Sequence, residues 1–231
     1  MDFFETVSKR RSIRKFHATK VPEEVINKAL DAALLAPNSS NMQPWEFYWV
    51  RSKDKKQQLV EACFKQPAAS TAQEIIVAVA RKDTWKRNQG LMLQYLEKIK
   101  APKGAFDYYT KLVPLAYSQG PLGLFGLLKQ IPVFFIGMFR PIPRGPFSNS
   151  ELFQVLVKTT ALACENFMLA ITAQGFGCCP MEGYDESRVK KILGLDGNCR
   201  IVMAISVGET DPSGIYGPQF RHARELFIFE V

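Results

Sequence analysis

A basic cluster near the start of the chain has the composition of an anion-binding site. Arg10, Arg11 and Arg14 lie close together in the sequence, and Ser12 stands between them. Guanidinium groups hold phosphate oxygens in bidentate geometry and keep their charge at any working pH, and a serine hydroxyl adds a further donor. A charge run of this kind also occurs as a plain solvated surface. The cluster alone therefore leaves both interpretations open.

A second polar cluster, at residues 37–45, combines hydroxyl and amide side chains between two prolines. Such groups can hydrogen-bond a polyol, an amide-bearing ring or a phosphate, and the prolines fix the backbone that presents them. The alternative is a capped turn in which the same side chains satisfy the end of the preceding helix. The hydrogen-bonding side chains are Asn38, Ser39, Ser40, Asn41 and Gln43.

Hydrophobic periodicity predicts the elements that would position these clusters. The stretch from Ser150 to Gln174 is apolar nearly all round a helix, so it must be buried in a core or between subunits. Asp185 is placed to cap a further helix. Helices are expected at about 25–34, 53–64, 150–174 and 185–193, and strands at 47–50, 75–80, 176–179, 201–207 and 226–229.

The middle of the chain, about 85–150, is broken repeatedly by glycine and proline and is predicted to be irregular. It contains an apolar run, Leu122 to Phe139, that Lys129 to Pro132 interrupt, so it lacks the ~20 uninterrupted apolar residues of a membrane span. Two interpretations follow: a lid with an aromatic substrate pocket, which we favour, or a membrane-surface patch beside Arg140 and Arg144.

The composition predicts a single domain over residues 1–231 with a sizeable core, since 47% of the residues are hydrophobic. A formal net charge of +8 favours anionic partners. The chain shows neither an interleaved basic and aromatic array nor zinc-finger spacing, so we expect no nucleic-acid partner. His17 and His222 fit no metal or catalytic-triad spacing, and no metal site is predicted.

The cysteines predict a reducing compartment. There are five of them, an odd number without a CxxC motif, which is typical of thiols packed in a cytoplasmic core rather than of disulfides. Acidic residues stand near the N-terminus where a signal peptide would be basic. Cys178 and Cys179 are adjacent, but neighbouring residues of a strand point to opposite faces, so we expect packed thiols rather than a redox pair.

Four segments, in this order, resemble those of the FMN-dependent nitroreductase family: residues 10–14, 37–45, 180–185 and 214–224. In that family the first arginine and the serine of the basic cluster reach the FMN phosphate and ribityl chain. The resemblance therefore implies that Arg10, Arg11, Ser12 and Arg14 bind FMN. It also implies that residues 37–45, called the amide-rich loop below, lie against the flavin, usually from the partner chain. Asn38 stands where many members carry serine.

The resemblance gives the later segments specific roles. In Pro180-Met181-Glu182-Gly183 the main-chain N–H of Glu182 would point at flavin N5, and the glycine would allow close approach. Arg14 would lie near flavin N1 and O2, where a fixed cation stabilises negative charge and raises the reduction potential. Glu182 and Arg14 are thus the expected catalytic residues.

Other contacts are implied less sharply by the resemblance. A polar residue between the third helix and the second strand contacts the flavin in the family, and Lys65 and Gln66 are the two candidates. A basic residue near the C-terminus meets the phosphate, for which Arg221 is the better match and Arg224 the second.

The fold implied is α+β, a mixed or antiparallel central sheet flanked by helices, with a divergent lid at about 85–150. The protein would be a homodimer with helix 150–174 at the interface and the last strand joining the partner's sheet. The function implied is ping-pong hydride transfer from NADH or NADPH through FMN to an electron-poor acceptor such as a nitroaromatic or quinone. Alternatives are dehalogenation or flavin fragmentation on the same fold, or a non-catalytic FMN-binding or membrane-surface protein.

Overall fold

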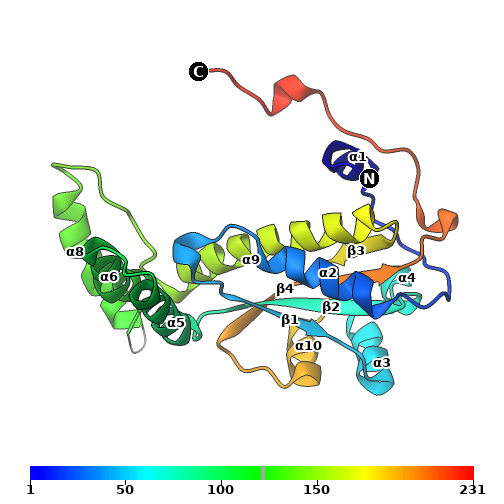
Figure 1. Cartoon of the computed structure of the whole chain (residues 1–231), viewed down its shortest axis with the longest axis horizontal. Helices are drawn as coiled ribbons and strands as arrows, with labels where there is room; N and C mark the ends of the chain where they lie inside the picture. The colour runs from blue at the N-terminus through cyan, green and yellow to red at the C-terminus, as the bar shows by residue number, and fades with distance from the viewer. Residues whose placement is uncertain (121–122) are drawn as a thin grey trace.

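A four-stranded antiparallel sheet forms the middle layer of the computed structural model, which describes residues 1–120 and 123–231 (Figure 1). Pro121 and Leu122, the latter the first residue of the apolar run 122–139, lie outside the described residues. The strand order is β1-β2-β4-β3. The strands are β1 (Trp45–Trp49), β2 (Glu74–Arg81), β3 (Gly177–Met181) and β4 (Cys199–Gly208). The α+β class and the antiparallel sheet expected from the sequence are confirmed.

Both faces of this sheet are covered, because its central strands are apolar on both sides. Along β2, Ile76 and Ala78 belong to the core on one face, whereas Ile75 and Val77 belong to the core on the other. This is the alternation that a pleated strand imposes. Helices α2 (Glu23–Leu34) and α9 (Asn149–Ala173) cover the first face, and α3 (Lys53–Ala62) and α10 (Glu186–Leu193) cover the second (Figure 1).

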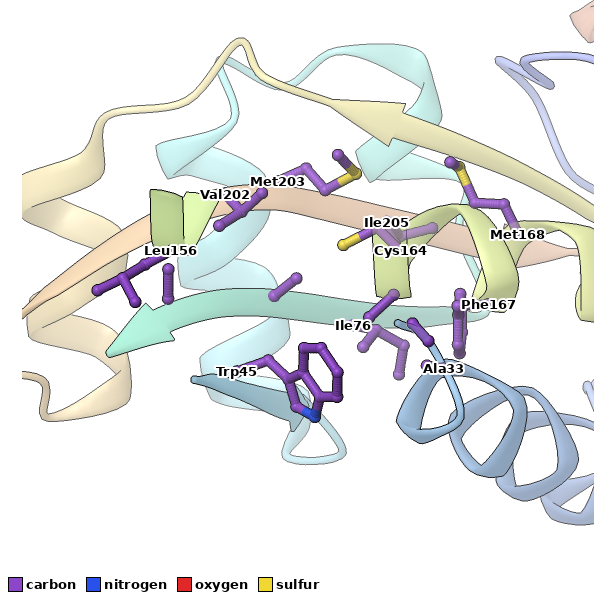
Figure 2. Packing of buried hydrophobic residues seen from close by; sticks show 14 of the residues in the cluster. Ala33, Trp45, Ile76, Leu156, Cys164, Phe167, Met168, Val202, Met203 and Ile205 are labelled. Atoms are coloured by element: carbon purple, nitrogen blue, oxygen red, sulfur yellow. The ribbon is translucent and has the colours of Figure 1, made fainter. Parts of the chain in front are cut away.

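Helix α9 is the main packing element of the first face. Ser148 caps its start by accepting a hydrogen bond from the main chain of Glu151. Phe167 and Cys164 are fully buried between the helix and the sheet (Figure 2). Among the described residues this is the one helix long and apolar enough to cross a membrane. Its packing on the sheet and on α2 accounts for that composition without a membrane.

Helix α2 runs antiparallel to α9. The side chain of Asn166 donates to the carbonyl of Ala32 at 3.1 Å, and that of Gln174 donates to the carbonyl of Val25, also at 3.1 Å. The C-terminal end of α2 therefore lies beside the middle of α9, and its N-terminal end lies beside the last turn. The shorter elements outside the middle segment are α1 (Phe3–Lys9), η1 (Ser39–Asn41), α4 (Pro67–Ser70), η4 (Pro212–Gly214) and η5 (Arg224–Leu226).

The middle segment, residues 85–150, is mostly helical. The prediction of irregular structure for it was therefore wrong. Two of its prolines lie within helices: Pro114 in a first turn, where no N–H is needed, and Pro132 inside α8, which therefore lacks one N–H donor. Gly126 is also helical and buried. The elements are α5 (Trp85–Lys98), α6 (Lys103–Asp107), the π-helical turn η2 (Tyr108–Leu112), α7 (Val113–Tyr117) and α8 (Leu124–Ile136).

The strand predicted at 226–229 does not form in the single chain. The last part of the chain, which contains η5, extends away from the rest of the protein as an arm (Figure 1). The arm is apolar at its end, where Phe227 and Phe229 are exposed. A strand needs a neighbouring strand to pair its main-chain groups. Among the described residues the arm has none, and therefore the β-like pattern is not realised.

The cysteine predictions agree with the structure. All five thiols are free and buried. Cys178 belongs to the core under α9 and Cys179 to the core on the other face, so the two adjacent side chains point apart. Burial raises the pKa of Cys63 to about 11 and the pKa values of Cys164 and Cys178 to about 12.

We expect the native thiols to resist modification at pH 8. Because burial raises their pKa values further above the solution pH, they stay protonated when the chain is folded, whereas unfolded cysteine, with a pKa of ~8.5, is partly ionised. An aromatic disulfide reagent should react slowly with the native protein and promptly with all five thiols in urea. Prompt reaction of a thiol in the native protein would contradict the buried placement.

Candidate functional site

Four of the predicted arginines meet in one polar cavity. The cavity has a volume of about 230 Å³ and brings the basic cluster at residues 10–14 together with residues 216–221. Its walls are Arg10, Arg11, Ser12, Arg14, Tyr216, Pro218, Gln219, Phe220 and Arg221. Three guanidinium groups from one end of the sequence thus lie with a fourth from the other end. Arg224, the second C-terminal candidate, does not line this cavity.

Main-chain hydrogen bonds hold the basic segment in place. The N–H of Ile13 donates to the carbonyl of Cys178 at 3.0 Å, where Ser12 forms a parallel bridge to β3. The N–H of Arg14 donates to the carbonyl of Gly214 at 2.9 Å. The segment is therefore fixed between the outer edge of β3 and the C-terminal loop.

Two side-chain contacts complete the cavity wall. Arg11 Nη2 donates to the carbonyl of Gly217 at 2.9 Å, and the Arg14 guanidinium carbon lies 4.9 Å from the centre of the Tyr216 ring. A ring face attracts a cation at this distance. Arg11 and Arg14 are consequently oriented by the segment that also carries Arg221.

The cavity is strongly cationic. Within the part of the chain that the structure describes, Arg10 is the one of these four arginines that makes a salt bridge, with its Nε 3.8 Å from a carboxylate oxygen of Glu165. Burial raises the pKa of the neighbouring Cys179 thiol, and the charges of Arg14 and Arg10 oppose that rise. The arrangement suits an anion with several oxygens, because fixed guanidinium groups supply both charge and directed N–H donors.

The segment Pro180 to Gly183 lies on the same edge of the sheet as Ser12. The carbonyl of Cys178 faces outward, away from β4, because it accepts from Ile13. N–H groups two residues apart point to the same side of a strand. Pro180 has no N–H to offer on that side, and the alternation directs the N–H of Glu182 outward. The side chain of Glu182 is exposed.

The structure separates the two candidates that precede β2. Gln66 Nε2 donates to the carbonyl of Gly183 at 2.9 Å, which ties this residue to the end of β3. Lys65 instead directs its ammonium to Glu61, with 3.1 Å between Nζ and Oε1. Gln66 therefore joins the Pro180 to Gly183 segment, and Lys65 does not.

The amide-rich loop has a strained and well-supported backbone. Ser40, Asn41 and Gln43 have φ values of 57°, 48° and 42°, in the left-handed region that ordinary residues seldom adopt. Within the loop, the Asn38 side-chain oxygen accepts from the N–H of Gln43 at 2.8 Å. This contact accounts for part of the support, and the rest comes from the middle segment.

Tyrosines and one asparagine of the middle segment hold the loop from outside. Tyr109 donates its hydroxyl to the carbonyl of Ser40 at 2.8 Å, and Tyr117 donates to the carbonyl of Ser39 at 3.2 Å. Burial raises the pKa of Tyr117 to about 12, so its hydroxyl stays protonated and can donate at neutral pH. Asn88 donates to the carbonyls of Met42 and Gln43 at 2.7 and 3.2 Å.

An apolar pocket of about 490 Å³ adjoins this loop. Ser40 and Tyr108 form its polar side, and the Ser40 hydroxyl lies 2.5 Å from the Tyr108 hydroxyl. Aliphatic side chains of α7 and α8, such as Val113 and Ile136, line much of the remainder. The pocket is therefore suited to an apolar molecule that enters beside the loop.

The cationic cavity and the amide-rich loop lie at opposite ends of the α2–α9 pair. The loop follows the C-terminal end of α2, whereas the basic segment is bonded to β3, which follows the C-terminal end of α9. These helices are antiparallel, and a 12-residue helix is about 18 Å long. In one chain the two halves of the predicted site do not meet (Figure 1).

Comparison with known proteins agrees with this arrangement of elements. The model of the nitroreductase family matches residues 7–209. The chain belongs to the nitroreductase family. YdgI of Bacillus subtilis, whose name places it among NAD(P)H nitroreductases, is 29% identical over 216 residues, covering 92% of this chain and 90% of that protein.

Two further similar proteins have descriptions that mention a cofactor. An NADH dehydrogenase of Thermus thermophilus is 28% identical over 200 residues, which is 87% of this chain and 82% of the relative. A protein of Exiguobacterium sibiricum, solved in complex with FMN, has a TM-score of 0.73 and 25% identity, with 100% of this chain and 98% of that chain covered.

Some residues that build the site gave no signal in the sequence. Tyr216 was part of the C-terminal segment but carried no assigned role, and Asn88 lay in a segment expected to be irregular. The tyrosines that support the loop are separated from it by about seventy residues, as Ser40 and Tyr109 show.

Replacing Asn88 should destabilise the amide-rich loop. Asn88→Ala removes two hydrogen bonds and leaves the carbonyl of buried Met42 without this donor, so we expect a loss of about 1–3 kcal/mol in the free energy of unfolding. Urea denaturation would measure this loss. Gln94→Ala, at an exposed position of the same helix, is the control and should change stability by less than about 0.5 kcal/mol. Equal effects of the two substitutions would contradict the role assigned to Asn88.

Proposed function

We propose that this nitroreductase is an FMN-dependent NAD(P)H oxidoreductase that reduces an electron-poor apolar acceptor. The observation that carries the proposal is the convergence of Arg10, Arg11, Arg14 and Arg221 with Ser12 in one cavity. This donor set fits a phosphate monoester, because it offers several guanidinium groups and a hydroxyl. FMN in the Exiguobacterium protein and NADH in the name of the Thermus relative support the choice of cofactor and donor.

The chain's own residues supply binding and electrostatics. When bound, FMN supplies the hydride chemistry between the nicotinamide and the acceptor. Arg10, Arg11, Ser12 and Arg221 would hold the phosphate, and Arg14 would provide a fixed positive charge to the flavin. The N–H of Glu182 would offer a hydrogen bond to the cofactor, and Gln66 fixes the carbonyl of Gly183 beside it. Pro180, Met181 and Gly183 would form the surface on that side.

The proposed active form is a homodimer, because one chain does not bring the two halves of the site together. In the dimer, Asn38, Ser39, Ser40, Asn41 and Gln43 of one chain approach the cationic cavity of the other. Exposed apolar residues at the N-terminal helix and the C-terminal arm support this assembly, since Phe4 is 81% exposed and Phe229 is 74% exposed. Apolar surface of this kind is typical of subunit interfaces.

The middle segment would act as the lid and select the acceptor. Its pocket of about 490 Å³ is mostly apolar and meets the amide-rich loop at Ser40. Aromatic acceptors such as nitroaromatics or quinones match this lining, because their rings are apolar and their oxygens can accept from a hydroxyl. The buried free thiols support a cytoplasmic location.

The proposal is tested by the visible absorbance of the purified protein, followed by anaerobic addition of NADH and then NADPH. We expect a bound flavin that bleaches within seconds, and the faster donor identifies the nicotinamide preference. A protein that is colourless and takes up no added FMN would contradict the proposal. A bound flavin that neither donor reduces would favour an FMN-binding protein without this activity.

The two C-terminal arginines provide a matched pair for the phosphate site. Arg221→Ala removes a guanidinium from the cavity and should raise the Kd for FMN roughly tenfold or more, since a hydrogen bond to a charged group contributes about 1.5–3 kcal/mol. Arg224→Ala removes the same charge outside the cavity and should have a far smaller effect. Quenching of FMN fluorescence during titration measures both. Equal weakening by the two variants would show that overall charge, and not the cavity, sets the affinity.

A further inference from the structure

Helix α8 buries its lysine against the protein and presents large apolar side chains to solvent. Lys129 is buried, and its ammonium donates to the carbonyls of Leu115, Ser118 and Pro146 at 2.8, 3.0 and 3.3 Å. The opposite side carries six large apolar residues that are 56% to 88% exposed: Leu127, Leu128, Ile131, Phe134, Phe135 and, one turn further, Phe139. A surface helix of a water-soluble domain has the reverse arrangement.

The orientation of this helix is fixed by close packing. A Cβ atom at Gly126 would lie 1.9 Å from the carbonyl oxygen of Phe147, so the helix approaches the following loop at a position that only glycine tolerates. Together with the three hydrogen bonds of Lys129, this contact prevents the helix from turning its apolar side inward. The apolar side is therefore a stable feature of the folded chain.

The charge around the helix indicates what could cover it. Lys129 is buried, and Lys111 pairs with Asp107 at 2.8 Å between Nζ and Oδ1. Arg140 and Arg144 are exposed just beyond the C-terminal end of α8. An apolar helix face with two exposed arginines at its end matches the surface of an anionic lipid bilayer, where acyl chains meet negative headgroups.

A second copy of the chain fits this surface less well. A symmetric contact brings the same patch of both copies together, and here it would bring Arg140 and Arg144 of one copy toward those of the other. The helix also lies at one end of the molecule, apart from α1 (Figure 1).

We propose that the outward side of α8, with Arg140 and Arg144, docks the protein on an anionic membrane surface. The helix has 13 residues, too short to cross a bilayer, which takes ~20, so it lies along the interface. This inference goes beyond the proposed function and does not rest on it, because the surface is defined without reference to FMN or to the acceptor.

Co-sedimentation of the intact protein with lipid vesicles tests the proposal. The vesicles are phosphatidylcholine alone and phosphatidylcholine with phosphatidylglycerol. We expect binding to the anionic vesicles, retained in part at high salt because of the apolar contribution, and at least tenfold weaker binding to phosphatidylcholine alone. Ile131→Gln combined with Phe135→Gln should reduce binding to anionic vesicles at least tenfold.

A matched variant and two further measurements control this experiment. Phe64→Gln changes an aromatic residue that is 69% exposed beside α3, at the other end of the molecule, and should bind vesicles as the unchanged protein does. Circular dichroism and flavin content of each variant report folding and the cofactor site separately. A double variant that keeps both and loses vesicle binding supports the docking surface.

Two results would overturn the proposal. One is an absence of vesicle binding by the unchanged protein, or equal binding by the unchanged protein and the folded double variant. The other is a fall in particle size on size-exclusion chromatography when Ile131 and Phe135 are replaced, without vesicle binding by the unchanged protein. That second result would show that another copy of the chain covers this side of α8.

Discussion

The hydrogen bond from the Ile13 N–H to the Cys178 carbonyl is the contact on which the cationic cavity depends. It attaches a segment from the start of the chain to the outer edge of β3. The next main-chain bond, from Arg14 to Gly214, attaches the C-terminal loop to the same segment. Because both bonds use main-chain atoms, the arginine side chains are left to face the cavity. Main-chain hydrogen bonds thereby hold a cluster of like charges together without using the charged groups themselves.

The sheet and the long helices could be predicted from the sequence, because their burial produces strong patterns. β2 and β4 are buried on both faces and appear as continuous apolar runs, and α9 is apolar almost all round. The middle segment could not be predicted in this way, since its short helices depend on tertiary contacts such as those of Asn88 and Tyr109. The end of the chain shows the converse case: residues 226–229 have a strand pattern, but the single chain offers no strand beside them.

Part of the candidate site could also be predicted from the sequence. The arginines near both ends carry an obvious chemical signature, and the structure brings Arg221 to Arg10, Arg11 and Arg14. Lys65 and Gln66 are neighbours in sequence, and nothing in the residue types distinguishes them. The hydrogen bond from Gln66 to Gly183 does so. Tyr216 escaped notice because its role comes from the position of its ring under Arg14, which depends on how two distant segments fold together.

Pro180 has a consequence for how the folded protein behaves in a crowded solution. β3 is an edge strand, and an exposed edge is a template on which the strand of another molecule can pair and begin aggregation. The imide nitrogen of Pro180 cannot donate on that edge, and the segment around Ser12 already occupies the Cys178 carbonyl. The same residues thus deny this sheet edge to a foreign strand. Resistance to aggregation at β3 is in this way provided by a single stretch of backbone.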